Sequence, residues 1–163
     1  MALDGMTLYY DDLETGMRTE TQGRTITEAD VVNFAGVSGD YNPLHMDAEF
    51  AKTTPFGQRI AHGLLVLSAA TGLRSHITRM EGALLAFLEI RSWRFRKPVL
   101  IGDTIRARTE VKELRPTSNP QRGIVVLAVQ VLNQHGHVVQ EGELVFLVRT
   151  RAAAGTGPAA QTG

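Results

Sequence analysis

The 163-residue sequence contains no cysteine and has no net charge, since 17 Lys and Arg residues balance 17 Asp and Glu residues. Without cysteine the chain forms no disulfide, no thiolate nucleophile, no cysteine-ligated zinc finger and no iron–sulfur cluster. A zero net charge supplies no overall field that would attract nucleic acid or an anionic membrane. We therefore expect a protein that binds neither nucleic acid nor a membrane.

Long apolar runs are also missing. The most apolar stretch, residues 64–73, is about half as long as a bilayer-crossing helix, and residues 1–12 contain no apolar leader segment. Hydrophobic residues still make up 43% of the chain, which is enough for a globular core. We expect a soluble, cytoplasmic protein with one domain over residues 1–150. Residues 151–163 have no large apolar side chain and are expected to be a disordered tail.

The spacing of apolar residues predicts helices in the first half of the chain and strands in the second. Thr27 and Asp30 resemble a capping box at the start of a first helix. The longest helix is expected over residues 61–77, and it is apolar on nearly every face, which is typical of a helix wrapped by other structure. Alternating patterns predict strands over residues 18–25, 84–96, 104–112, 123–132 and 142–150. One buried helix followed by an antiparallel meander indicates an α+β fold.

The richest polar segment spans residues 38–47. Asn42 and Pro43 predict the start of a short helix, which places His45 in its first turn and Asp40 in the loop just before it. A carboxylate and an imidazole that share one water molecule form a proton-transfer pair. The plainer interpretation is a capped surface turn with an exposed histidine.

A second candidate segment, residues 55–63, leads directly into the long apolar helix. Gly63 at the helix entrance leaves backbone N–H groups uncovered, and with the helix dipole they can stabilise a carbonyl that is becoming an enolate. Alternatively, Gly63 only permits close packing of the helix on the sheet. His62 is expected near the substrate as a capping or core histidine, without a catalytic role.

Other residues are candidates for holding the substrate. Leu64 and Leu65 can line a slot for an apolar chain, although most such leucines belong to a core. Thr71 is expected on the helix face toward the active centre. Arg94 and Lys97 belong to a basic cluster that could neutralise phosphates, or that forms a solvated strand face.

Taken together, these motifs resemble the MaoC-like dehydratase family, which includes the (R)-specific enoyl-CoA hydratases. The resemblance depends on DYNPLHMD at residues 40–47, FGQRIAHG at residues 56–63 and FRKPVLIGD at residues 95–103. Residues 10–16 and 25–30 also resemble segments of this family, so the resemblance covers about residues 8–150. It implies the hot-dog fold, in which an antiparallel sheet wraps a long central helix.

The resemblance also implies roles for individual residues. Asp40 and His45 would bind and activate the water that adds to a trans-2-enoyl thioester, giving an (R)-3-hydroxyacyl thioester, although the sequence leaves open which residue is acid and which is base. The N–H of Gly63 would hold the thioester oxygen. Asn42 would orient the loop, and Asp47 would support the site from behind. The substrate would be an acyl-CoA or acyl-carrier-protein thioester, with no cofactor and no metal, and the protein would be a homodimer or a larger homo-oligomer.

Three alternatives remain at this point. A hot-dog thioesterase would share the fold and the ligand, but such enzymes generally place a carboxylate near the central helix, and residues 61–79 contain neither Asp nor Glu. A metal site could combine His45 and Asp47 with a distant histidine, as in the two-histidine-one-carboxylate oxygenases. Finally, the chain could be an inactive thioester-binding subunit.

Overall fold

The computed structural model describes residues 7–154, apart from the side chains of residues 76 and 77. Its elements in chain order are η1 (Tyr10–Asp12), β1 (Arg18–Glu20), β2 (Arg24–Thr25), α1 (Glu28–Ser38), α2 (Pro43–Met46), α3 (Ala48–Lys52), α4 (Gly63–Thr78), β3 (Leu84–Phe95), β4 (Thr104–Pro116), β5 (Arg122–Leu132), β6 (Val138–Arg149) and α5 (Arg151–Ala154). No helix within the described part of the chain is long and apolar enough to cross a membrane.

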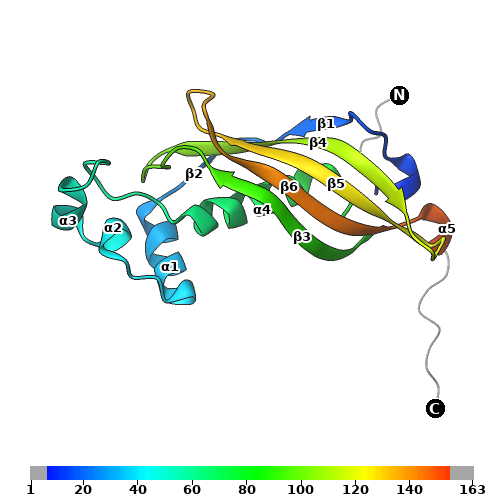
Figure 1. The fold of residues 1–163 in the computed structure, drawn as a ribbon, viewed down its shortest axis with the longest axis horizontal. Coiled ribbons are helices and arrows are strands. Elements are labelled where there is room, and N and C mark those ends of the chain that lie inside the picture. Colours follow the sequence, from blue (N-terminus) through cyan, green and yellow to red (C-terminus); the bar gives the residue numbers. More distant parts are fainter. Residues whose placement is uncertain (1–6, 155–163) are drawn as a thin grey trace, which may run out of the picture.

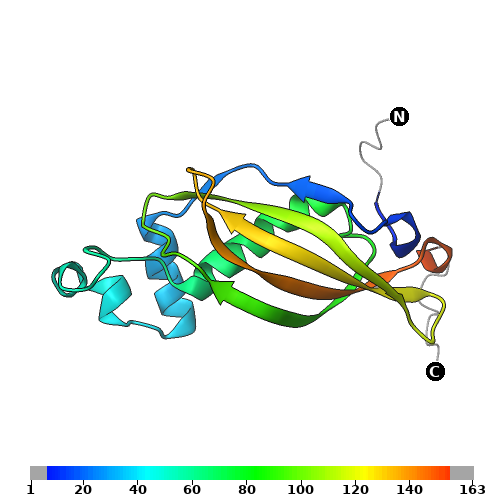
Figure 2. The same ribbon diagram turned by 45° about the horizontal axis from the view of Figure 1, so that its top comes forward.

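One antiparallel sheet forms most of the molecule. Its strands follow the order β1-β4-β5-β6-β3. The short strand β2 also pairs with β4, at the first two residues of β4, whereas β1 pairs with residues 108–110. The sheet curves around α4, while α1, α2 and α3 gather at one end of it (Figures 1 and 2). The expected α+β layout is confirmed. The expectation of a simple meander, in which consecutive strands pair, is wrong for β3. That strand pairs with β6 instead of β4, because alternation along a strand does not specify its neighbour.

The central helix is buried along the face that meets the sheet. Leu65, Val66 and Ala69 pack in one core cluster with residues of the long strands, including Ile105 and Val131. Burial of aliphatic side chains on both elements removes apolar surface from water and fixes the helix on the concave face. The helix keeps one exposed stripe, at residues 64, 68 and 72.

The connection between β3 and β4 passes the amino end of α4. The N–H of Ala61 donates to the carbonyl oxygen of Val99 at 2.8 Å, and Ile60 forms a bridge with Leu100. These contacts bring residues 56–63 and 95–103 side by side, although they are far apart in the sequence. Two of the three characteristic segments therefore meet at this end of the helix.

The start of the expected disordered tail is ordered. Residues 151–154 form α5, in which Ala153 is buried. The backbone N–H of Arg151 donates to Asp11 at 2.8 Å, and its guanidinium pairs with Asp12 at 2.5 Å. Polar contacts and one small side chain hold this segment, so the absence of large apolar residues was an insufficient reason to expect disorder. Residues 155–163 lie outside the described part of the chain.

Candidate active site

The loop after α1 places Asp40 next to the start of α2. Helix α1 ends at Gly39, whose φ of 75° reverses the chain in a conformation that glycine adopts readily. The carboxylate of Asp40 accepts from the N–H of Asn42 at 3.2 Å, and the side chain of Asn42 accepts from the N–H of Leu44 at 3.0 Å. Asn42 thus caps α2 as expected, and this short helix carries His45.

A backbone contact fixes the tautomer of His45. Its Nδ1 lies 2.8 Å from the carbonyl oxygen of Ile60. Because a carbonyl oxygen can only accept, Nδ1 carries the proton, and the neutral ring then has its free lone pair on Nε2. Such a nitrogen can take a proton from water.

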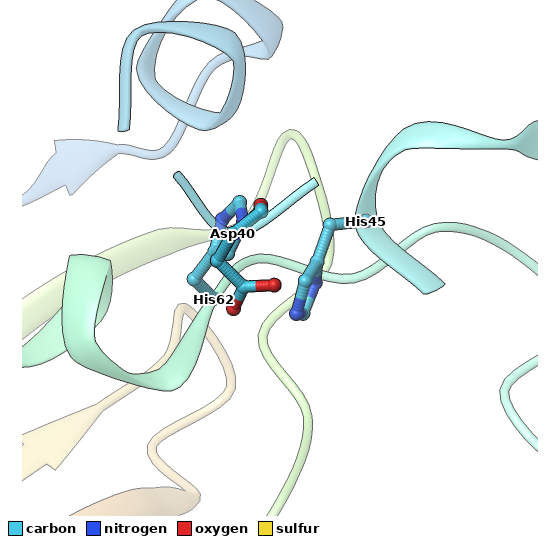
Figure 3. A group of neighbouring side chains, drawn as sticks. All are labelled: Asp40, His45 and His62. Carbon is cyan, nitrogen blue, oxygen red and sulfur yellow. The ribbon is translucent and has the colours of Figure 1, made fainter. Parts of the chain in front are cut away.

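His62 joins the two residues into one cluster. Its Nε2 donates to the backbone carbonyl oxygen of Asp40 at 2.9 Å, and its ring centroid lies 3.9 Å from that of His45. His62 is 2% exposed. One polar side-chain atom from each of the three residues lies within 4.8 Å of the others. The carboxylate of Asp40 points toward His45 (Figure 3). The structure therefore brings Asp40 and His45 together and gives His62 the position of a buried support.

A cavity of about 440 Å³ opens beside this cluster. Its lining includes His45, Phe56, Gly63, Leu64, Phe95 and Lys97. Most of its walls are apolar, which suits an apolar ligand.

The amino end of α4 forms part of the cavity wall. His62 precedes the first helical residue and its side chain makes no capping hydrogen bond. The first N–H groups of a helix have no partner within the helix, and Gly63 and Leu64 line the cavity. The positive end of the helix dipole is thus available to an oxygen atom bound there.

Gly63 is also needed for space. A Cβ atom at this position would lie 2.6 Å from the ring of Phe95. For the enoyl-thioester hydration that the sequence resemblance leads us to expect, Gly63→Ala should lower kcat about tenfold or more, because Phe95 lines the cavity and its ring has to shift to admit the new Cβ atom. In the double variant Gly63→Ala/Phe95→Ala part of the activity should return. Initial rates with purified proteins test this, and equal activity of both variants would contradict the steric explanation.

The remaining candidates divide between the cavity and other places. Leu64 and Lys97 line the cavity, whereas Leu65 is buried in the core and is absent from its lining. Thr71 is also absent from the lining of this cavity. It lies two turns farther along α4, and its hydroxyl donates to the carbonyl oxygen of Leu67 at 2.9 Å.

Arg94 faces a different hollow. It lines a groove of about 530 Å³ on the sheet face that turns away from α4, together with Arg18 and Arg108. Arg96 borders both the groove and the cavity, but it pairs with Glu141 at 2.6 Å. This hydrogen-bonded pairing lowers the pKa of Glu141. Lys97 has no carboxylate partner among residues 7–154 and is the cation at the cavity that remains free for an anionic group.

Asp47 has a local structural role at the start of α3. Its carboxylate accepts from the N–H groups of Glu49 and Phe50, both at 2.9 Å, and so caps α3. Among the described residues, the histidines and carboxylates that converge closely enough to hold a cation do not include Asp47, which the alternative metal triad would use. A cation could still be held by Asp40, His45 and His62, because their polar atoms converge.

Comparisons with known proteins agree with this geometry. The family described as "MaoC like domain" matches residues 12–132. The chain belongs to this family. It is 44% identical over 112 residues to the 3-hydroxybutyryl-CoA dehydratase of Methylorubrum extorquens, covering 67% of both chains. It is 36% identical over 155 residues to the (R)-specific enoyl-CoA hydratase of Rhodospirillum rubrum, covering 93% of this chain and 99% of the relative.

The family resemblance expected from the sequence is thus confirmed, and the relatives' names place the chain among the hydro-lyases. A structure from Mycobacterium tuberculosis, described as a double hot-dog fold, superposes with a TM-score of 0.77 at 23% identity. The match covers 96% of this chain and 47% of that one. At this identity the likeness concerns the fold alone, and it confirms the hot-dog fold.

Proposed function

We propose that this chain catalyses the reversible addition of water to a trans-2-enoyl thioester, giving a 3-hydroxyacyl thioester. The observation that carries the proposal is the convergence of Asp40 and His45 beside a cavity that reaches the open amino end of α4. The names of the family relatives support the same reaction class and favour coenzyme A as the carrier and the (R) product.

In the proposed hydration step, water binds between Asp40 and His45. Its oxygen attacks C3 of the enoyl group while one of its protons moves to Nε2 of His45, the basic nitrogen of the neutral ring whose Nδ1 donates to Ile60. The electrons of the C2=C3 bond move to C2 and the thioester oxygen. A proton then returns to C2, delivered from this pair of residues, so that the elements of one water molecule have been added.

The negative charge formed in this step falls on the thioester oxygen. The N–H of Gly63 is the proposed donor to it, assisted by the dipole of the 16-residue helix α4. Because the thioester already makes C2 acidic and both proton transfers use side chains, the proposed reaction requires neither a cofactor nor a metal.

The apolar part of the cavity, including Leu64, is proposed to hold the acyl group, and Lys97 is proposed to meet an anionic group of the carrier. The groove that contains Arg94 lies on the other face of the sheet, so Arg94 is a weaker candidate for this role than Lys97.

Crotonyl-CoA tests the proposed function. We expect its enoyl absorbance to fall without release of free thiol, and chiral analysis should find the (R)-3-hydroxy product. Thiol release in place of hydration would indicate the thioesterase. Binding without turnover would indicate the inactive subunit, and a full complement of tightly bound metal required for turnover would contradict the metal-free step. Parallel assays with an acyl-carrier-protein thioester distinguish the two carriers.

We also propose that two copies of the chain pair through β3, the edge strand of the sheet. Large apolar side chains are exposed along this strand, namely Leu84, Leu85, Phe87, Leu88, Ile90 and Phe95. An exposed apolar edge strand invites continuation of the sheet into another chain, and an identical edge pairs with itself in a twofold dimer.

A charge placed on this edge should separate the copies. We expect wild-type protein to sediment as a dimer and Ile90→Lys to shift it toward monomer, because a buried unpaired ammonium is costly. Met17→Lys provides the control, since Met17 is an exposed apolar residue beside β1, at the other edge of the sheet. A monomeric wild type, or an unchanged dimer in the Ile90→Lys variant, would contradict the proposal.

A further inference from the structure

Gln140, on β6, links the sheet to the amino end of the central helix. Its Nε2 donates to the carbonyl oxygen of Gly63 at 2.9 Å, and its Oε1 accepts from the indole N–H of Trp93 at 3.1 Å. The side chain is 2% exposed and borders the cavity. A buried amide with partners on both ends is held in one orientation.

Both partners also determine which way the amide faces. An indole nitrogen can only donate, so it requires the oxygen of Gln140, and a carbonyl oxygen can only accept, so it requires the nitrogen. The arrangement therefore has one consistent assignment. Loss of the indole N–H of Trp93 should therefore loosen the orientation of Gln140 and weaken its hydrogen bond to the carbonyl oxygen of Gly63.

An irregularity in β3 makes the contact with Trp93 possible. The pairing of β3 with β6 shifts register between Arg91 and Arg94, and Ser92 has a φ of 50°. Such a bulge re-aims the neighbouring side chain. Gly142 leaves space for the indole, since a Cβ there would lie 2.6 Å from its Cε3 atom. Three features of the sheet thus serve to bring Trp93 to Gln140.

We infer that Gln140 is a positioning residue that aims the first N–H groups of α4 at the thioester oxygen. Gly63 has the widest backbone freedom of any residue, and no side chain caps this helix end. Holding its carbonyl oxygen fixes the rigid peptide that Gly63 shares with Leu64. It also limits rotation about φ and ψ of Gly63, the two bonds that join this peptide to the one that carries the Gly63 N–H. The inference rests on the proposed function, because it assigns Gln140 to the geometry of that reaction.

Gln140→Met tests the inference, because methionine has a similar size but makes neither hydrogen bond. For crotonyl-CoA hydration we expect kcat to fall about tenfold with little change in KM, since the misplaced donors matter most when charge develops on the oxygen. Trp93→Phe should give a smaller loss. The double variant should be no slower than Gln140→Met alone, because Trp93 acts only through Gln140.

Gln140→Glu supplies a readout that simple packing would not change. A protonated carboxyl can donate to Gly63 and accept from Trp93, whereas a carboxylate cannot donate. The ratio of this variant's kcat to that of wild type, measured at each pH, should therefore rise as the pH falls. Thermal unfolding of each variant, followed by circular dichroism, shows whether the assayed protein is folded.

The outcomes separate the two proposals. If wild-type protein hydrates crotonyl-CoA and folded Gln140→Met keeps its full kcat, the role of Gln140 is overturned while the proposed function stands. A flat kcat ratio for Gln140→Glu across the pH range also overturns it. Absence of hydration by wild-type protein contradicts the proposed function and, with it, this role of Gln140.

Discussion

Replacing Asp40 by Asn should lower kcat for crotonyl-CoA hydration by about 10³-fold or more. The amide has nearly the shape of the carboxylate, and it can still accept the hydrogen bond from the N–H of Asn42. It can neither take up nor deliver a proton at the pH of the assay. Asp40 is exposed on a polar loop, so the free energy of unfolding should change little.

Asp47→Asn is the matched control for this experiment. The carboxylate of Asp47 lies on the same polar segment but caps α3, and Asn is an equally good capping residue. We expect this variant to keep nearly full activity. Equal losses in the Asp47 and Asp40 variants would contradict the specific role of Asp40, as would a wild-type rate in Asp40→Asn.

His45→Gln should lower kcat by about 10²–10⁴-fold, because the glutamine amide has no basic nitrogen to accept the proton of water. The reason lies in the tautomer: the contact with Ile60 leaves Nε2 as the acceptor of His45. Initial rates measured by loss of enoyl absorbance give the size of the effect. His137→Gln, in the exposed turn before β6, should keep the activity of wild type.

The losses of kcat caused by Asp40→Asn and His45→Gln should not be additive when the two substitutions are combined. If Asp40 and His45 hold one water molecule between them, removal of either residue disables the same step, and the double variant should be little slower than the worse single variant. Losses that multiply in the double variant would indicate two independent roles. That result would contradict a shared water.

The sequence predicted the local part of the site well. The Asn–Pro start of α2 and the glycine that ends α1 act over a few residues, so the positions of Asp40 and His45 relative to each other follow from short-range rules. The long apolar helix and its open glycine entrance were also predictable, because periodicity and composition report directly on burial.

Features that depend on distant pairing were not predictable in the same way. Gln140 lies just before the strand expected over residues 142–150, and nothing in the sequence around it indicates a contact with Gly63, 77 positions earlier in the chain. Its partner Trp93 lies where β3 shifts register against β6, and such a shift is not predictable from the local sequence. Thr71 is absent from the cavity lining, and its hydroxyl has a partner within its own helix.

A crystal structure of Asp40→Asn with bound 3-hydroxybutyryl-CoA would show whether Asp40 and His45 meet the substrate at C3. We predict the C3 hydroxyl within about 3 Å of both the residue 40 side chain and Nε2 of His45, with the thioester oxygen at the N–H of Gly63. A thioester bound away from the amino end of α4, or a hydroxyl out of reach of His45, would contradict this prediction.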